Sequence, residues 1–166
     1  MAATNAPAIA GQDVAYLTRQ LQNFRSGVRG AHKADSYGAQ MRSIAATLPN
    51  DAAVASVAAD VASLPKPISR PTPGADLHNG NNLYQGKCGA CHGTQAEGNV
   101  SLSTPRLAGI DAAYLRRQYQ NFAAGVRGAQ PQDRYGKQMA MMSKSLASPK
   151  DLDDVIAYIQ AIGAQK

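Results

Sequence analysis

Tryptophan is absent from this chain, and only two phenylalanines and two cysteines occur among its 166 residues. Two halves of about 80 residues with so few large aromatic side chains contain little apolar material for two separate cores. We therefore expect some other apolar body to fill at least one of them. Both cysteines lie within one pentapeptide, residues 88–92, that is used for other chemistry, so no structural disulfide is available to take over this role.

Long apolar runs are also absent. No stretch approaches the roughly 18–20 apolar residues that cross a bilayer, so we expect the chain not to span a membrane. The first residues, Met1 to Pro7, lack both the basic segment and the apolar run of a secretory signal peptide. Either a leader has been removed or the sequence begins late.

No dense cluster of charge of one sign is present. The formal net charge is +6 at pH 7, but the basic residues are scattered along the chain. A dispersed positive charge favours steering toward an acidic protein partner over nucleic-acid binding. We therefore predict protein partners and no nucleic acid, with Arg116 and Arg117 as candidate steering residues.

Both cysteines belong to one pentapeptide, Cys88-Gly89-Ala90-Cys91-His92. Two thiols at this spacing can each add to a vinyl group of haem, and the adjacent histidine can then reach the iron; this is the pattern of c-type haem attachment. We predict haem c held covalently by Cys88 and Cys91, with His92 as an axial iron ligand. The porphyrin would be the missing apolar body, and attachment of this kind predicts a periplasmic protein.

Two other chemistries use cysteines at this spacing. Structural zinc usually takes four protein ligands, and only Cys88, Cys91 and His92 cluster in this sequence. A thioredoxin-like CxxC requires a βαβ setting, which a helical chain does not provide. Both alternatives are disfavoured.

Most of the remaining sequence occurs twice, at an offset of 98 residues. From residue 7 to residue 48, 23 of 42 positions are identical to the positions 98 residues later, without a gap. A proline-rich linker, residues 65–74, separates copy one (residues 1–64) from copy two (residues 75–166). Residues 75–98, which contain the haem-attachment motif, have no equivalent in copy one.

The secondary structure is predicted to be all-α, since no alternating strand pattern occurs. Apolar residues at helical spacing, with capping residues at the ends, predict five helices. They are expected at residues 13–26, 51–64, 76–85, 111–124 and 149–162, the fourth beginning with Asp111 as its cap.

A methionine is the expected second axial ligand, because a soft, neutral thioether suits an electron-transfer haem. Met139, Met141 and Met142 are candidates, and Met139 is preferred because Met41 occupies the same position in copy one. The alternative is that these methionines are core residues. The Pro105 carbonyl is a candidate acceptor for the other ring nitrogen of His92, and a plain loop proline is the equal alternative.

The sequence resembles class I cytochromes c. The resemblance rests on Gly80 and Tyr84 before the CxxCH, the Pro-x-Leu-Ala-Gly segment at Pro105, the following helix with Tyr114, Met139, and a closing helix with Tyr158. The tandem form is similar to the cytochrome c4 group. This implies a periplasmic dihaem electron carrier with two similar domains related by a pseudo-twofold axis, contact of Gly80 and Tyr84 with the last helix at Tyr158, and a place for Tyr114 at the haem.

Copy one departs from this pattern, because it has no cysteine and no histidine before Pro7 and cannot hold haem covalently. Either an upstream segment is missing, and Met41 is the axial ligand of a first haem, or copy one is a degenerate domain without haem. The retained Met41, Tyr37 and Arg29 favour the first account, which we prefer. Ala58 aligns with Tyr158 because the offset shifts to 100 in the last helix, and its small side chain favours the second account. His32 is expected to be exposed to solvent.

The predicted function is electron transport by a His/Met-ligated haem that exchanges electrons with acidic redox proteins or with a membrane oxidase or dehydrogenase. We expect no catalytic residues. The alternative is a haem c subunit bound to a larger redox enzyme, such as a flavoprotein dehydrogenase. A peroxidase or gas sensor would need an open sixth position on the iron.

Overall fold

The computed structural model describes residues 6–164, in which the chain forms eight α-helices and one isolated bridge, between Asn99 and Thr104, but no strand. The all-α prediction is confirmed. The helices of copy one are α1 (Val14–Arg25), α2 (Ser36–Ala45) and α3 (Asp51–Ser63). Those of copy two are α4 (Leu77–Lys87), α5 (Gly89–His92), α6 (Ala112–Ala123), α7 (Arg134–Met142) and α8 (Pro149–Gly163). Residues 1–5 and 165–166 of the two predicted copies lie outside the described part.

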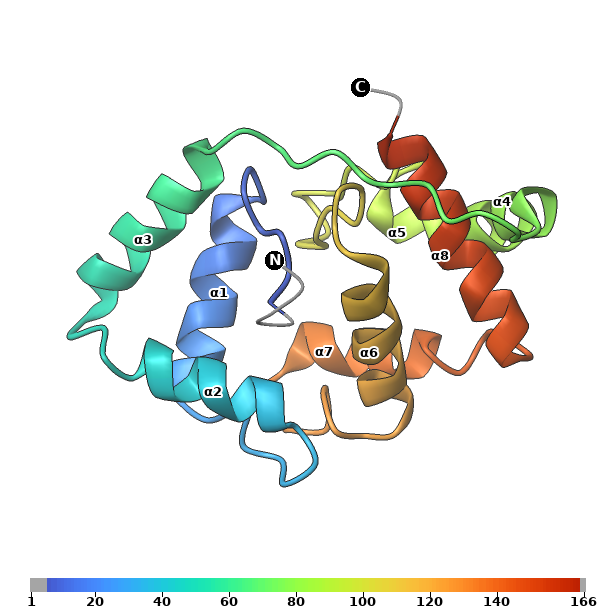
Figure 1. Ribbon diagram of the computed structural model, residues 1–166. Coiled ribbons are helices and arrows are strands. Elements are labelled where there is room, and N and C mark those ends of the chain that lie inside the picture. The colour runs from blue at the N-terminus through green and yellow to red at the C-terminus, as the bar shows by residue number, and fades with distance from the viewer. Residues whose placement is uncertain (1–5, 165–166) are drawn as a thin grey trace.

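The two copies stand side by side, and the non-helical segment between α3 and α4 runs across the top of both in Figure 1. This segment is tied to copy two, because Ser69 donates its backbone N–H to the Gly163 carbonyl at 3.2 Å. The Ser69 hydroxyl also accepts the Gly109 N–H at 2.8 Å. Within the described residues, no helix is both long and apolar enough to cross a membrane.

The five predicted helices are present with ends shifted by at most two residues, but α2, α5 and α7 were not predicted. Helices α2 and α7 begin in the same way: Asp35 and Asp133 each accept the backbone N–H of the glycine three residues later, at 2.9 Å. A Cβ at Gly136 would lie 2.8 Å from the Asp133 Oδ1 atom, so this cap requires glycine. Short helices that depend on a capping geometry carry a weak periodic signal.

The core of copy two is formed where α4 crosses α8. Tyr84, Val155 and Ile159 are buried there together, and the Tyr84 and Tyr158 rings lie 5.6 Å apart between centroids. A Cβ on Gly80 would lie 2.7 Å from the Asp154 carbonyl carbon and 3.0 Å from the Tyr158 Cβ, so only glycine permits this approach. The contact that the resemblance implied is therefore present.

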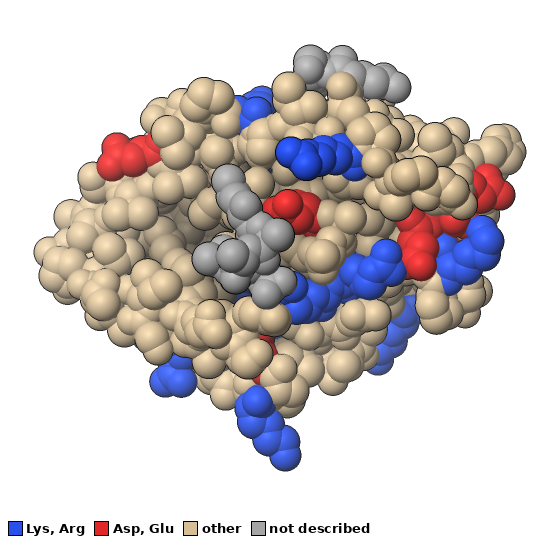
Figure 2. All heavy atoms as spheres, viewed as in Figure 1, with Lys and Arg blue, Asp and Glu red and all other residues tan. Residues whose placement is uncertain are grey.

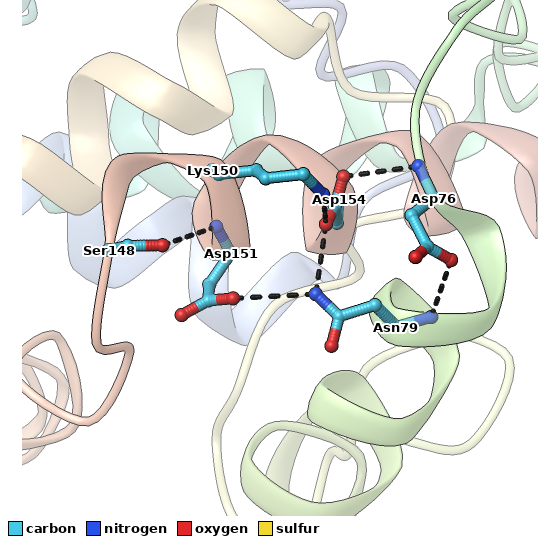
Figure 3. A network of polar contacts seen from close by, with 6 residues as sticks. All are labelled: Asp76, Asn79, Ser148, Lys150, Asp151 and Asp154. Carbon is cyan, nitrogen blue, oxygen red and sulfur yellow. Dashed lines mark hydrogen bonds and ion pairs between the residues drawn. The ribbon is translucent and has the colours of Figure 1, made fainter.

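A polar network fixes α4 along α8 (Figure 3). The buried Asp154 carboxylate accepts the Asp76 N–H at 3.1 Å and the Asn79 amide at 2.8 Å, and it pairs with Lys150 at 2.5 Å. Hydrogen bonds from Lys150 and then Asn79 lower the pKa of Asp154, which keeps it ionised. Since Cys88 directly follows α4, this network positions the haem-attachment motif relative to α8.

The interface between the copies repeats itself under the offset of 98. Arg29, in the loop after α1, donates to the Gln118 side-chain oxygen of α6 at 3.1 Å. Its counterpart Arg127, in the loop after α6, donates to the Gln20 oxygen of α1 at 2.9 Å. The same contact is thus made in both directions, as in an isologous dimer interface.

Two further contacts follow the same symmetry. Arg19 of α1 lies over the Tyr135 ring of copy two, 4.3 Å from its centroid, and Arg117 of α6 lies over the Tyr37 ring of copy one at 4.5 Å. These two pairs are equivalent under the offset. The pseudo-twofold relation that the resemblance implied is therefore visible in the contacts between the copies.

Candidate haem site

The CxxCH motif forms the single helical turn α5, which follows α4 after Cys88. Cys88 is half-buried and Cys91 is exposed. Burial raises the pKa of the Cys88 thiol to about 11, so the group stays protonated near neutral pH. Redox-active CxxC cysteines have lowered pKa values, so this environment disfavours thiol–disulfide exchange.

His92 is buried, with 9% of its surface exposed. Its Nδ1 lies 3.0 Å from the carbonyl oxygen of Pro105, which is one of the two roles that the sequence left open for this proline. Because a carbonyl can only accept, Nδ1 must carry the ring proton, and Nε2 then presents a lone pair. Burial lowers the pKa of His92, which favours this neutral form. A neutral imidazole with its tautomer fixed in this way is suited to ligate iron.

The loop before Pro105 is attached to the motif itself. The bridge between Asn99 and Thr104 closes this loop, and the Thr104 hydroxyl donates to the Cys91 carbonyl. The segment that supplies the carbonyl for His92 is thus tied to the helical turn that supplies His92. The bridge and the Thr104 hydrogen bond together limit how far the Pro105 carbonyl and the His92 ring can separate.

Three methionines lie on or at the end of α7, and they differ in exposure. Met141 and Met142 are 69% and 42% exposed, whereas Met139 is partly buried. Met41 is also partly buried and lies on α2, the copy-one counterpart of α7. Met139 is therefore the least exposed of the three methionines, and it is also the one with a counterpart, Met41, in copy one.

Apolar side chains that the protein only partly covers surround the buried core of copy two. Leu107, Leu115 and Leu146 pack against this core but remain partly exposed, as does Cys88. An incompletely covered apolar surface beside the attachment thiols fits a porphyrin, which would cover it on binding.

Arg106 is a buried cation that sequence analysis did not identify. Its guanidinium donates to the carbonyls of Ala108 and, at 2.7 Å, Ala10, and among the described residues it has no carboxylate partner. Burial lowers its pKa, and its Nε has no hydrogen-bond partner in the described structure. A buried cation without an anion is unfavourable, so the site fits a ligand that carries carboxylates, as haem does.

The remaining residues that the sequence singled out lie in the interface between the copies, on the surface or at the start of a helix. Tyr114, placed at the haem by the resemblance, accepts a hydrogen bond from Arg29 at 2.9 Å in the interface between the copies. His32 is exposed, as expected. Arg116 is paired with Asp153, and Arg117 lies over Tyr37, so these two arginines are engaged in contacts within the protein. Asp111 precedes α6, but its side chain forms no cap hydrogen bond to that helix.

Known proteins resemble this chain over nearly its whole length. The cytochrome c family matches residues 77–163. A cytochrome c4 of Azotobacter vinelandii is 31% identical over 171 residues, which cover 97% of this chain and 79% of that protein. The thiosulfate dehydrogenase electron acceptor of Stutzerimonas stutzeri (strain A1501) is 34% identical over 177 residues, which cover 100% of this chain and 75% of that protein.

A solved structure shows the same fold. The crystal structure of reduced recombinant cytochrome c4 from Pseudomonas stutzeri matches with a TM-score of 0.76 and 29% identity, over 95% of this chain and 85% of that chain. This chain therefore belongs to the cytochrome c4 family of class I c-type cytochromes, which are electron-transfer proteins that carry covalently bound haem c.

Proposed function

We propose that this chain holds one haem c through Cys88 and Cys91, with His92 and Met139 as axial ligands, and works as a periplasmic electron carrier. The observation that supports this most strongly is the hydrogen bond between His92 Nδ1 and the Pro105 carbonyl, which leaves Nε2 for the iron. In this proposal, copy two (residues 75–166) is the haem domain. The described part of copy one (residues 6–64) packs against it.

Haem c supplies one-electron exchange between Fe(III) and Fe(II) when it is bound. His92 and Met139 together would occupy both axial positions, and a thioether favours the reduced iron. Arg106 would balance carboxylate charge near Pro105. Cys88 and Cys91 would hold the group, and with His92 and Met139 as protein ligands to its iron, the chemistry that it would supply is outer-sphere electron exchange with no substrate bound to the metal.

The ligand assignment predicts the behaviour of Met139→Ala. The variant should lose the Met-to-iron charge-transfer band and have a lower midpoint potential, because the ligand that favours Fe(II) is gone. Its reduced form should also bind carbon monoxide, which the unmodified protein should not. Optical titration and spectroelectrochemistry measure all three effects.

The repeat supplies the matched control. Met41→Ala removes the equivalent methionine of copy one and should leave the band, the potential and the carbon monoxide response unchanged. If Met139→Ala keeps the band while Met141→Ala or Met142→Ala loses it, the assignment to Met139 is wrong. Carbon monoxide binding by the unmodified protein would instead favour a gas sensor or peroxidase.

Redox enzymes are the proposed partners. The relative named as an electron acceptor of thiosulfate dehydrogenase suggests a dehydrogenase as electron donor for this chain. A free carrier and a bound subunit of such an enzyme are both compatible with this relation. Co-purification of a dehydrogenase with the native protein at high salt would favour the subunit.

Positive charge is proposed to guide these encounters. The basic residues are dispersed over the face shown in Figure 2, and acidic residues are interspersed among them. Lys87 directly precedes Cys88, is exposed, and donates to the Ser145 carbonyl at 2.5 Å. It therefore lies closer in sequence to the attachment site than Arg116 and Arg117, and it is the better residue for a steering test.

Reduction by an anionic one-electron reductant should slow as ionic strength rises, because the Debye length shrinks to about 8 Å near 0.15 M. Lys87→Glu should flatten this salt dependence, and stopped-flow kinetics would measure it. Lys33→Glu makes the same charge change in an exposed loop of copy one and should have a smaller effect. If the two variants change the salt dependence equally, that dependence reflects the net charge of the protein and not local steering by Lys87.

A further inference from the structure

The peptide group between Pro105 and Arg106 is hydrogen-bonded at both of its ends. Its carbonyl oxygen lies 3.0 Å from Nδ1 of His92. Its N–H, which belongs to Arg106, donates to the side-chain oxygen of Gln12 at 2.9 Å. Because a peptide group is planar and rigid, these two hydrogen bonds together hold the whole Pro105–Arg106 peptide group in one position.

Gln12 belongs to copy one, and both ends of its side-chain amide form hydrogen bonds with the backbone of Arg106. Its Nε2 donates to the Arg106 carbonyl at 2.9 Å, while its oxygen accepts the Arg106 N–H. The Gln12 side chain is buried, with the residue 4% exposed. Water therefore cannot readily replace this amide, and the contact lies in a low-dielectric environment where hydrogen bonds are strong.

The corresponding peptide group of copy one is hydrogen-bonded to a side chain of copy two. Pro7 and Ala8 are the counterparts of Pro105 and Arg106 at the offset of 98. The Ala8 N–H donates at 3.1 Å to the carboxylate of Asp111, which belongs to copy two. In each copy, the peptide N–H that follows the repeated proline therefore donates to a side-chain oxygen of the other copy.

Gln12 and Arg106 are also points where the repeat is not conserved. Gln12 aligns with Ile110, and Arg106 aligns with Ala8. The contact formed by Gln12 therefore joins two residues that both differ between the copies. Simple retention of the duplicated sequence does not account for it.

We propose that Gln12 of copy one is a positioning residue for the iron ligand of copy two, and that it lowers the reduction potential of the haem through the Pro105–Arg106 peptide. The inference rests on the proposed ligation by His92. Acceptance of the N–H by Gln12 polarises the peptide and makes the Pro105 carbonyl a stronger acceptor. A stronger bond to Nδ1–H makes the imidazole a better donor to iron, which favours Fe(III).

The test is Gln12→Met, which keeps the length and the apolar part of the side chain but removes its two hydrogen bonds to Arg106, together with the one that it accepts from the Asp13 N–H at 3.1 Å. The midpoint potential should rise. Exchange of the His92 Nδ1 proton, followed by NMR of the holoprotein, should become faster, by less than the roughly tenfold expected when one ordinary hydrogen bond is lost completely. Gln12→Glu retains the acceptor oxygen, and its potential should be no higher than that of the unmodified protein.

Gln20→Met is the matched control, because it removes another cross-interface hydrogen bond from copy one without contacting Arg106. It should leave the potential and the proton exchange unchanged. An unchanged potential in Gln12→Met, an equal rise in Gln20→Met, or a rise in Gln12→Glu would each overturn the proposal.

Ligation by His92 is tested separately, by loss of the low-spin spectrum in His92→Ala. If that spectrum is lost while Gln12→Met has no effect, the inference fails and the proposed function stands. If His92→Ala keeps the spectrum, the proposed ligand set fails and the inference fails with it.

Discussion

Cys88→Ala combined with Cys91→Ala is expected to abolish covalent haem and to leave copy two without a stable fold. The buried cluster where α4 crosses α8 consists of four residues, Tyr84, Ala96, Val155 and Ile159. The leucines around it are only partly covered. Covering an apolar side chain of this size contributes about 1.5–3 kcal/mol, so several of them approach the roughly 5–15 kcal/mol that stabilise a whole domain.

Covalent haem is measured by a pyridine haemochrome assay and by haem staining after denaturing electrophoresis, and folding by thermal denaturation followed by circular dichroism. The unmodified chain should contain one haem, and the double variant none. The single variant Cys91→Ala keeps one attachment thiol and should retain covalent haem and most of the stability. Two haems per unmodified chain, or a double variant that melts cooperatively at the original temperature, would contradict the prediction.

Gly80→Ala is expected to destabilise copy two by about 3 kcal/mol, at the upper end of the usual cost of overpacking. The added Cβ would overlap the backbone of Asp154 and lie 3.0 Å from the Tyr158 Cβ, so helices α4 and α8 would have to separate. Backbone atoms cannot rotate away as the end of a flexible side chain can. Thermal denaturation should show a midpoint lower by on the order of 10 °C.

Gly86 supplies the control, because it lies on the same helix and a Cβ there would meet no atom within 4 Å. Gly86→Ala should leave stability unchanged or raise it by up to about 1 kcal/mol, since alanine favours the helix more than glycine does. Equal melting temperatures for the two variants would show that the close approach of α4 and α8 contributes little.

Much of the site could be predicted from the sequence, because its chemistry depends on residues close together in the chain. The CxxCH spacing identifies Cys88, Cys91 and His92, and thirteen residues separate His92 from the proline whose carbonyl it contacts. The longer helices were also predictable, since their apolar faces repeat over several turns. Helices α2 and α7 were missed because an aspartate and a glycine, and no long apolar face, determine where they begin.

Contacts between the copies could not be predicted in the same way. The identity of Arg29 with Arg127 showed that a common role had been kept, but periodicity does not show which partner each residue meets. The structure places Tyr114 against Arg29 of the other copy, a contact that the sequence did not indicate. Gln12 and Arg106 lie 94 residues apart, and no local pattern links them.

The covalent linker between the copies changes how strong their interface has to be. Two binding surfaces on a short tether meet at an effective concentration in the millimolar range. A surface with a dissociation constant of about 1 mM, equivalent to roughly 4 kcal/mol, would leave separate chains apart at micromolar concentration, yet it suffices to hold tethered ones together for much of the time. The arginine–glutamine and arginine–tyrosine contacts can therefore remain few and polar. Substitutions in either copy can then remove or replace individual contacts at the interface without separating the two copies.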